Sequence, residues 1–299
     1  MKVLITGASG LLGAALAFSF RKNFDVLASY SSNGFQLDDC RTVFLDITDA
    51  QGTFQLLAKE KPDAVVHCAA LVGINACEKD KKFAYKINVE GAKNIAESAH
   101  KINSRVIYIS TDYVFDGSKG MYSEVDKPSP INYYGESKLE GEQFMKLQRD
   151  AIIRTSIFGW NIVPQKKSFS SWIIEELENK KNINVFDDQF NSMILVNNLS
   201  QALSEIVEQG HNGILNVASS ERISKHEFAL KLAKIFNLDS SLINPIKNLG
   251  MAGFEKRPHD TSLDISKAKK ILKTKLNNME ENIKMLKKLK EENYLNNFR

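Results

Sequence analysis

Apolar and polar residues alternate along the first 155 residues in two distinct patterns. Six short apolar runs are rich in β-branched residues, as buried strands are: KVLITG, DVLASY, TVFLDI, DAVVHCAA, RVIYIS and AIIRTS. Between most of them, apolar residues recur at helical spacing in LLGAALAFSFRKN, AQGTFQLLAKEK, the stretch 78–102 and YGESKLEGEQFMKLQ. Apolar strands that alternate with helices predict an α/β fold with a doubly wound parallel sheet, the Rossmann arrangement.

The pattern becomes looser after residue 156. Helices are predicted over 168–180, 197–209, 224–237 and 266–274, and short strands near 183–186, 193–196 and 213–217. Ser224, followed by Glu227 three residues later, forms a capping-box pattern at the start of one of these helices. We therefore expect a dinucleotide-binding Rossmann domain over 1–156 and a smaller α/β substrate lobe over 157–299. Segments near 183–217 are expected to return to the first domain.

Composition narrows the class of protein. The 299 residues are 43% hydrophobic, which is enough to bury a large core without disulfides. The three cysteines, Cys40, Cys68 and Cys77, lack metal-ligand spacing, so we expect no metal and a reducing, cytoplasmic location. No apolar run approaches the roughly 20 residues that span a bilayer, and the N-terminal run is too short for a signal peptide. We expect no membrane partner.

Positive charge is concentrated near the C-terminus. Residues 267–299 hold ten basic and four acidic residues, a net charge of +6 in a chain whose formal charge is +4. Their lysines lie among apolar residues at helical spacing, without the interleaved aromatic residues of a nucleic-acid surface. This pattern predicts a solvated terminal helix and no nucleic-acid partner, with contact to an anionic partner as the alternative.

Three glycines follow the first predicted strand and open the first helix. Gly7, Gly10 and Gly13 are spaced G-x-x-G-x-x-G, which lets the backbone turn tightly and approach a pyrophosphate. The helix N-terminus then offers free N–H groups to the phosphates. A tight strand–helix turn without a ligand is the alternative. The segment predicted to hold the cofactor phosphates comprises Gly7, Ser9, Gly10, Leu11, Leu12 and Gly13.

The end of the second strand bears on the choice of cofactor. An acidic residue there would bind a ribose 2′-hydroxyl and repel a 2′-phosphate. Residues 29–33 read SYSSN, with Tyr30 and Asn33 among hydroxyls and no acid, so NADP(H) is favoured over NAD(H), although no arginine is placed to bind the phosphate. The next strand ends in Asp46 and Ile47, where the adenine is expected.

A tyrosine and a lysine stand one helical turn apart. Tyr134 and Lys138 share a helix face, whereas Tyr133 points to another side. An ammonium group near a phenol lowers the phenol's pKa, so that it can give a proton to a carbonyl oxygen as hydride attacks the carbon. Ser110 and Thr111 lie where the fifth strand ends and offer hydroxyls to the same edge of the sheet.

These features together resemble the extended short-chain dehydrogenase/reductase family, and within it the dTDP-4-dehydrorhamnose reductase branch. The similarity covers most of the chain and is carried by STDYVFDG, YYGESKLEGE, IIRTSIFGWN and KRPHDTSLDISKAKK. It implies reduction of the 4-keto group of a nucleotide-activated deoxysugar. A nucleotide-sugar epimerase remains an alternative. A second is a non-catalytic regulatory subunit similar to that of methionine adenosyltransferase. Whether the chain forms a homodimer stays open.

The resemblance implies roles for individual residues. Thr111, Tyr134 and Lys138 would be the catalytic trio, and Asp112 and Tyr113 would face the sugar. The C-terminal lobe would hold the nucleotide part of the substrate. Residues implied to touch the cofactor beyond the glycine segment are Tyr30, Asp46, Ile47, Cys68, Ala69, Ala70, Asn88, Ser110, Tyr134 and Lys138. Further substrate contacts are expected from Trp160 and Arg257.

The chain also departs from its branch. Members carry tryptophan directly after Arg-Thr-Ser, where this chain has Ile157, so Trp160 is the candidate for that stacking role. Met193 and Ile194 replace a proline-threonine pair. Sugar dehydratases carry Thr-Asp-Glu after the fifth strand, and Tyr113 in place of the glutamate disfavours dehydration. Elsewhere, we read His67 as a core histidine, and Glu140 and Glu142 as solvated.

Overall fold

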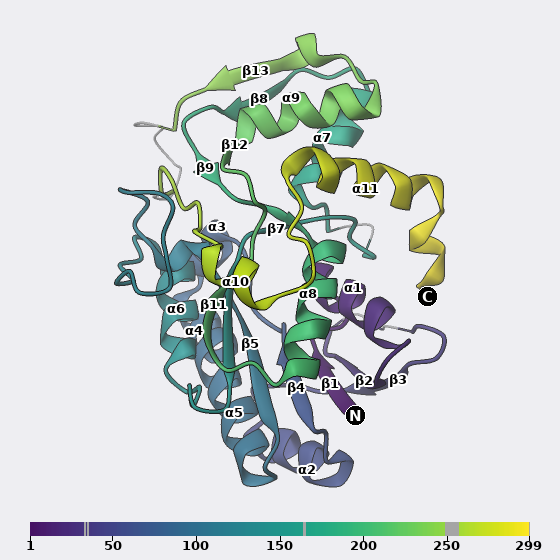
Figure 1. Cartoon of the computed structure of the whole chain (residues 1–299), viewed down its shortest axis with the longest axis vertical. Coiled ribbons are helices and arrows are strands. Elements are labelled where there is room, and N and C mark those ends of the chain that lie inside the picture. Colours follow the sequence, from purple (N-terminus) through teal and green to yellow (C-terminus); the bar gives the residue numbers. More distant parts are fainter. Residues whose placement is uncertain (33, 35, 164–165, 249–256, 299) are drawn as a thin grey trace.

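A parallel sheet of seven strands forms the centre of the computed structural model, which describes residues 1–299 except 33, 35, 164–165, 249–256 and 299. The strand order is β11-β6-β5-β4-β1-β2-β3 (Figure 1). The strands are β1 (Lys2–Thr6), β2 (Asp25–Tyr30), β3 (Arg41–Phe44), β4 (Ala64–His67), β5 (Arg105–Thr111), β6 (Ala151–Thr155) and β11 (Gly213–Asn216). All their pairings are parallel, which confirms the predicted doubly wound sheet.

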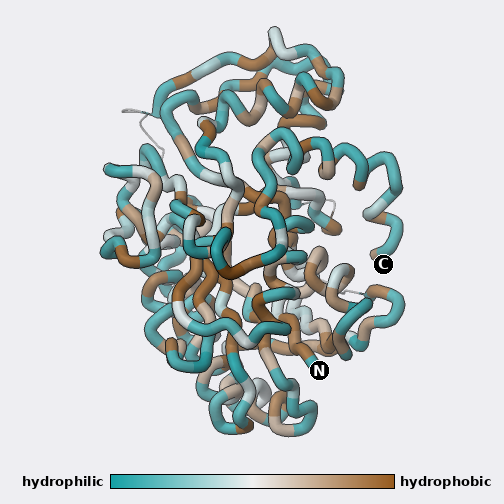
Figure 2. The backbone as a smooth tube through the Cα atoms, viewed as in Figure 1, coloured by the Kyte–Doolittle hydropathy of each residue, from teal (hydrophilic) through white to brown (hydrophobic). Residues whose placement is uncertain are grey.

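Helices cover both faces of the sheet, and alternate residues of each strand pack against opposite layers. Val3 and Ile5 of β1 belong to the core beneath α1 (Leu11–Phe20) and α8 (Val196–Gln209), whereas Leu4 packs on the other face. That second layer consists of α2 (Ala50–Glu60), α5 (Gly91–Lys101) and α6 (Tyr133–Glu142). Figure 2 shows the hydrophobic strands enclosed by hydrophilic outer turns. Apolar residues on both strand faces produce this burial.

The predicted helix over 78–102 is divided into shorter elements. They are α3 (Ile74–Lys79), α4 (Lys81–Tyr85), the π-helical turn η1 (Lys86–Glu90) and α5. Asp80 interrupts the run because its backbone is not helical and its side chain accepts a hydrogen bond from Phe83 N. A π-helical turn inserts an extra residue and changes the direction of the side chains after it.

A smaller lobe lies beyond the carboxyl ends of the strands (Figure 1). It has its own apolar core. Its elements are β7 (Ile157–Phe158), α7 (Phe169–Glu178), β8 (Ile183–Phe186), β9 (Phe190–Asn191), β10 (Ile194–Leu195), β12 (Ile223–Ser224), α9 (Lys225–Phe236), η3 (Ser240–Leu242), β13 (Ile243–Ile246) and α11 (Met279–Glu291). The last turn, η4 (Tyr294–Asn297), instead lies against α1, where the Tyr294 ring meets the Phe18 ring edge-on at 5.0 Å. Ser224 and Glu227 form the predicted capping box of α9.

Some later segments return to the central sheet. β11 pairs with β6 at the edge of the sheet, and α8 packs against α1. The helix α10 (Ser266–Ile271) then contacts β11. The strand β8, in contrast, pairs with β13 in the smaller lobe. The domain boundary at residue 156 stays a prediction.

The basic terminal segment is only partly solvated. Met279, Ile283 and Leu286 on one face of α11 are buried in the core of the smaller lobe, against α9. Lysines on other faces of α11 make surface ion pairs, including Lys284 with Glu280 at 2.6 Å. The predicted helix exists, and its apolar stripe anchors it.

Candidate active site

The glycine loop leaves β1 and enters α1 with very little room for side chains. Gly7 has φ +68°, and a Cβ there would lie 2.8 Å from the Ala69 Cα atom. A Cβ at Gly13 would overlap the Gly7 carbonyl oxygen, so this glycine lets α1 approach the loop. At Gly10, the N-cap of α1, a Cβ would meet only that same oxygen, at 3.1 Å. That contact is tight, but apart from chain neighbours and the helix backbone no other atom lies within 4 Å, so Gly10 is the least crowded of the three glycines.

The other residues predicted in this loop lie at the start of α1. Ser9 and Leu12 are buried, and Leu11 is half-buried. The first N–H groups of α1 receive no side-chain cap from Gly10. A helix N-terminus whose donors have no side-chain acceptor can bind an anion.

The ends of β2 and β3 place the residues predicted to meet the adenosine half of the cofactor. Tyr30 ends β2, and its ring meets the Phe44 ring edge-on at 6.3 Å. The Asp46 side chain is exposed and accepts hydrogen bonds from the Thr48 N–H (2.9 Å) and hydroxyl (2.8 Å). Ile47 is buried below Gly91. Asn33 lies outside the described residues.

The end of β4 is tied to the end of β1. The Thr6 hydroxyl accepts from the N–H groups of Cys68 and Ala69, each at 3.2 Å, and it bonds His67 Nδ1 at 2.7 Å. Burial and the charge of Lys138 lower the pKa of His67 to about 3, so this ring is a neutral core histidine, as predicted. Ala70 follows at the same edge of the sheet, half-buried.

Two hydroxyls at the end of β5 point to different partners. The Ser110 hydroxyl donates to Glu142 Oε1 at 2.5 Å and is buried beneath α6. Thr111 caps the short helix η2 (Asp112–Val114), accepting from Tyr113 N at 3.2 Å. Thr111, not Ser110, also lies near enough to the Tyr134 phenol to lower its pKa. Of the two candidates, the structure therefore brings only Thr111 to the tyrosine.

The helix α6 carries Tyr134 and Lys138 toward this point. Asn132 caps it by accepting from Gly135 N at 3.0 Å. Gly135 packs against the Tyr113 carbonyl, so that α6 begins directly beside η2. The rings of Tyr113 and Tyr134 meet edge-on, with centroids 6.1 Å apart.

The pKa of Tyr134 is shifted in the direction opposite to that expected. Burial raises this pKa above its ordinary value, and the hydrogen bond with Thr111 offsets only part of the rise. The sequence predicted a lowered pKa because an ammonium one turn away stabilises phenolate. In the structure Lys138 instead lies over the Tyr108 ring, with Nζ 4.1 Å from its centroid. Desolvation therefore dominates, and the phenol is protonated at neutral pH.

Lys138 is buried, with only 3% of its surface exposed. Burial lowers the pKa of its ammonium group to about 8, and Glu142 opposes this shift. Glu142, expected to be solvated, is buried and accepts from Arg154 Nε (3.0 Å) and Nη2 (2.7 Å). The sequence spacing shows Glu142 one turn beyond Lys138, but Arg154 comes from β6, so only the folded chain reveals their pairing.

Asn88 lies in η1, which packs against α6. Its Nδ2 donates to the Leu71 carbonyl and to the Ser137 hydroxyl, each at 3.0 Å, and its Oδ1 accepts from Leu71 N at 2.8 Å. Ser137 directly precedes Lys138. The asparagine thus links the loop after β4 to α6 and holds both near the sheet edge.

The substrate residues predicted from the sequence do not gather in one place. Asp112 is buried and accepts from the Thr111 hydroxyl (3.1 Å) and the Thr261 hydroxyl (2.6 Å), and burial raises its pKa. Burial raises the pKa of Tyr113 to about 12, and the charge of Arg257 opposes this rise. Trp160 is not brought to this group. Its indole donates to the Leu286 carbonyl at 2.9 Å and packs near Phe236, at the end of α9 away from Lys225. Trp160 thus packs against other residues of the smaller lobe instead of joining Asp112 and Tyr113.

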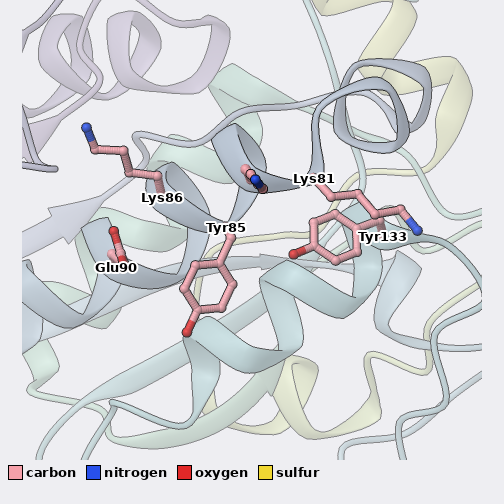
Figure 3. A pocket seen from close by; sticks show the side chains of 6 residues that line it. Lys81, Tyr85, Lys86, Glu90 and Tyr133 are labelled. Carbon is pink, nitrogen blue, oxygen red and sulfur yellow. The ribbon is translucent and has the colours of Figure 1, made fainter.

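A pocket of about 400 Å³ lies on the opposite side of α6 (Figure 3). It is lined by Lys81, Lys82, Tyr85, Lys86, Glu90 and Tyr133. Lys81 Nζ lies 5.1 Å above the Tyr133 ring. Tyr133 therefore faces α4 and η1 (Figure 3), whereas Tyr134 lies near Thr111 on another side of α6, as the spacing predicts.

Two features are absent from the described residues. No helix among them is both long and apolar enough to cross a membrane. Within the same residues, no group of three or more His, Cys, Asp or Glu side chains is arranged to hold a metal ion.

Comparison with known proteins agrees with this geometry. Residues 1–291 match the model of the RmlD substrate binding domain family. The methionine adenosyltransferase 2 subunit beta of Xenopus tropicalis is 30% identical over 90% of this chain and 82% of its own. A crystal structure of a hypothetical dTDP-4-dehydrorhamnose reductase from Sulfolobus tokodaii is 39% identical, with a TM-score of 0.84, over 93% of this chain and 97% of that one. A Bacillus anthracis dTDP-4-dehydrorhamnose reductase in complex with NADP is 27% identical, also with a TM-score of 0.84, over 95% and 98%.

Proposed function

Because the chain belongs to the RmlD substrate binding domain family, we propose that it is an NAD(P)H-dependent oxidoreductase that reduces the 4-keto group of a nucleotide-activated deoxysugar. Relatives named dTDP-4-dehydrorhamnose reductase support this activity. The observation that carries the proposal is the meeting of Thr111 and Tyr134 where β5 ends, beside a buried lysine.

The protonated state of the Tyr134 phenol favours reduction. Reduction of a ketone requires a proton donor at the carbonyl oxygen, and the raised pKa of Tyr134 keeps its phenol protonated at neutral pH. Thr111 bonds the same phenol and orients the carbonyl oxygen beside it. A bound reduced nicotinamide supplies hydride to the carbonyl carbon. Tyr134 donates its proton to the oxygen, the ketone becomes an alcohol, and the resulting phenolate takes a proton from water.

The residues at the strand ends fit a dinucleotide. The loop at Gly10 has room on its outer side, and the Gly7 backbone leaves no space for a side chain between β1 and β4. Gly7, Gly10 and the start of α1 would hold the pyrophosphate, Lys138 the nicotinamide ribose, and Tyr30 and Asp46 the adenosine half. No acidic side chain follows β2 within residues 29–32, so we propose a preference for NADP(H) over NAD(H). The NADP complex of the Bacillus anthracis protein supports this choice.

The smaller lobe completes the proposed substrate site. Asp112 and Tyr113 lie between Tyr134 and the lobe, with Thr261 and Arg257 as their partners. We place the sugar against Asp112 and Tyr113 and the nucleotide farther into the lobe.

The function is tested by mixing the purified protein with NADPH and dTDP-4-dehydrorhamnose, and separately with other nucleotide 4-keto sugars. We expect loss of the reduced-nicotinamide absorbance and a reduced nucleotide sugar detected by mass spectrometry. NADH at equal concentration should react more slowly. If no keto sugar oxidises NADPH although the cofactor binds, the proposal is wrong.

One observation favours a second function. Several relatives at 30–31% identity are beta subunits of methionine adenosyltransferase 2, and the chain covers 81–82% of their length. The second candidate is therefore a regulatory subunit that binds a partner enzyme. Co-purification with a methionine adenosyltransferase, together with a silent keto-sugar panel, would favour it over the reductase.

A further inference from the structure

Tyr108 lies in the middle of β5 and packs against α6, and its side chain is completely buried. Its hydroxyl donates to the Lys138 carbonyl at 3.2 Å, which fixes the ring against the backbone of α6. Gly141 makes room for this hydroxyl, because a Cβ at that position would overlap the Tyr108 oxygen. The strand and the helix are therefore fitted to each other at this ring.

The face of the same ring meets the charged end of Lys138. Nζ lies 4.1 Å from the ring centroid, within the distance at which a ring face attracts a cation. This attraction is stronger where water is excluded, and Lys138 is buried. Within the part of the chain that the structure describes, Lys138 forms no ion pair. Tyr108 thus contacts Lys138 at two points, the backbone carbonyl and the ammonium group.

The carboxylate of Glu142, one turn beyond Lys138 on α6, is bound to other partners. Its Oε1 accepts from the Ser110 hydroxyl at 2.5 Å and from Arg154 Nε at 3.0 Å. Its Oε2 accepts from Arg154 Nη2 at 2.7 Å, and both members of this ion pair are buried. Glu142 therefore anchors α6 to β5 and β6, and it favours the charged form of Lys138 without pairing with it.

The remaining titratable groups near Lys138 are neutral at pH 7. Burial lowers the pKa of His67 to about 3 and raises the pKa of Cys68 to about 12 and that of Cys77 to about 11. Burial also raises the pKa values of the phenols of Tyr108 and Tyr134. Because none of these groups carries a negative charge, the ring face compensates for part of the hydration that the buried ammonium group has lost.

We propose that Tyr108 is a positioning residue for Lys138, whose ring face holds the ammonium group in its charged form while its hydroxyl fixes the turn of α6 that carries it. This inference rests on the proposed function only for what Lys138 does, which is to hold the nicotinamide ribose. Removal of the ring face should destabilise the charged form. The Lys138 titration should then shift to lower pH, and NADPH binding should weaken at a lower pH.

The titration of Lys138 can be followed directly by NMR in the full chain labelled with ε-¹³C lysine, with the signal assigned by its absence from Lys138→Arg. We expect the ε-protons of Lys138 to resonate upfield, because an aromatic ring shields protons above its face, and to titrate near pH 8. Tyr108→Phe keeps the ring and should retain both properties. Tyr108→Leu should lose the upfield shift and titrate about one pH unit lower, a tenfold change in the proton equilibrium.

The affinity for NADPH, measured by fluorescence titration between pH 7 and pH 10, gives a second readout. Kd should rise as Lys138 loses its charge, and this rise should begin about one pH unit lower in Tyr108→Leu than in Tyr108→Phe. Phe158→Leu is the matched control, because it removes a completely buried ring from the core of the smaller lobe. It should keep the pH dependence of the unchanged protein.

If Tyr108→Leu does not fold, phenylalanine with two or three ring fluorines at position 108 replaces it, because fluorine weakens the attraction of the ring face without emptying the site. The Lys138 midpoint should then fall with each added fluorine. An equal midpoint in Tyr108→Leu, the fluorinated proteins and Tyr108→Phe would overturn the assignment, as would an equal shift in Phe158→Leu. Since the NMR titration needs neither cofactor nor turnover, a protein with the expected midpoints that reduces no keto sugar would refute the proposed function alone.

Discussion

At the scale of single residues, the site depends on where the protonated and charged groups sit before substrate arrives. Tyr134 has a raised pKa and Lys138 a lowered one, both chiefly because of burial. A buried phenol that keeps its proton at neutral pH is available as an acid, as the proposed ketone reduction requires.

Replacing Tyr134 tests the proton donor directly. Tyr134→Phe removes one hydroxyl and keeps the ring that contacts Tyr113. We expect kcat to fall by roughly two to four orders of magnitude, the usual contribution of a positioned acid, with little change in the Kd for NADPH. Tyr133→Phe, on the side of α6 that faces Lys81, is the control and should keep its activity. A nearly normal rate in Tyr134→Phe would remove this residue from the mechanism.

The pH dependence follows from Lys138. Its pKa is lowered to about 8, so the side chain is charged below that pH and neutral above it. We expect kcat/KM to decline as the pH rises through about 8, because Lys138 then loses the charge and the donor with which it is proposed to hold the nicotinamide ribose. Initial rates measured between pH 6 and pH 10 that stay constant would contradict this assignment.

At the scale of elements, the turn from β1 into α1 is the most constrained part of the proposed cofactor site. Gly7 and Gly13 are required by packing, because a Cβ at either position would strike backbone atoms. At Gly10 a Cβ would meet only the Gly7 carbonyl oxygen, at 3.1 Å, so packing constrains this position less. We therefore expect fold and ligand binding to depend on different glycines of the same motif.

Gly10→Val is expected to abolish dinucleotide binding, because its methyl groups would occupy the space of the phosphates. Fluorescence titration with NADPH measures this loss. The melting temperature without cofactor should fall far less than in Gly13→Ala, which forces α1 away from the loop. Unchanged NADPH affinity in Gly10→Val would show that the phosphates bind elsewhere.

Periodicity predicted the elements well where neighbours in sequence decide the structure. The six strands of the first half follow from their apolar runs, and the start of α9 follows from Ser224 and Glu227. The stretch 78–102 was predicted as one helix because its apolar spacing continues across Asp80. The break there depends on a local side-chain bond to Phe83 N, and the π-helical turn after it aligns Asn88 with Ser137 on another helix.

At the scale of the whole molecule, the residues that sequence reasoning missed are those whose partners are distant along the chain. Glu142 was predicted to be solvated. Its partner Arg154 lies on β6, and only the pairing of β6 with β5 brings the two side chains together. Trp160 was expected at the substrate because it could replace the tryptophan that relatives carry where this chain has Ile157. Its indole instead donates to the Leu286 carbonyl of α11.

The return of α8 and β11 to the sheet has a consequence for dissecting this protein. The chain leaves the half that contains the seven-stranded sheet after β6, returns to it for β11 and α10, and leaves it again at α11. No single cut separates the two parts, because a fragment that ends at β6 would lack β11 and α8. The edge of β6 would then be unpaired, and the face of α1 that packs against α8 would be exposed. Splitting, swapping or fusing these halves will therefore require at least two junctions.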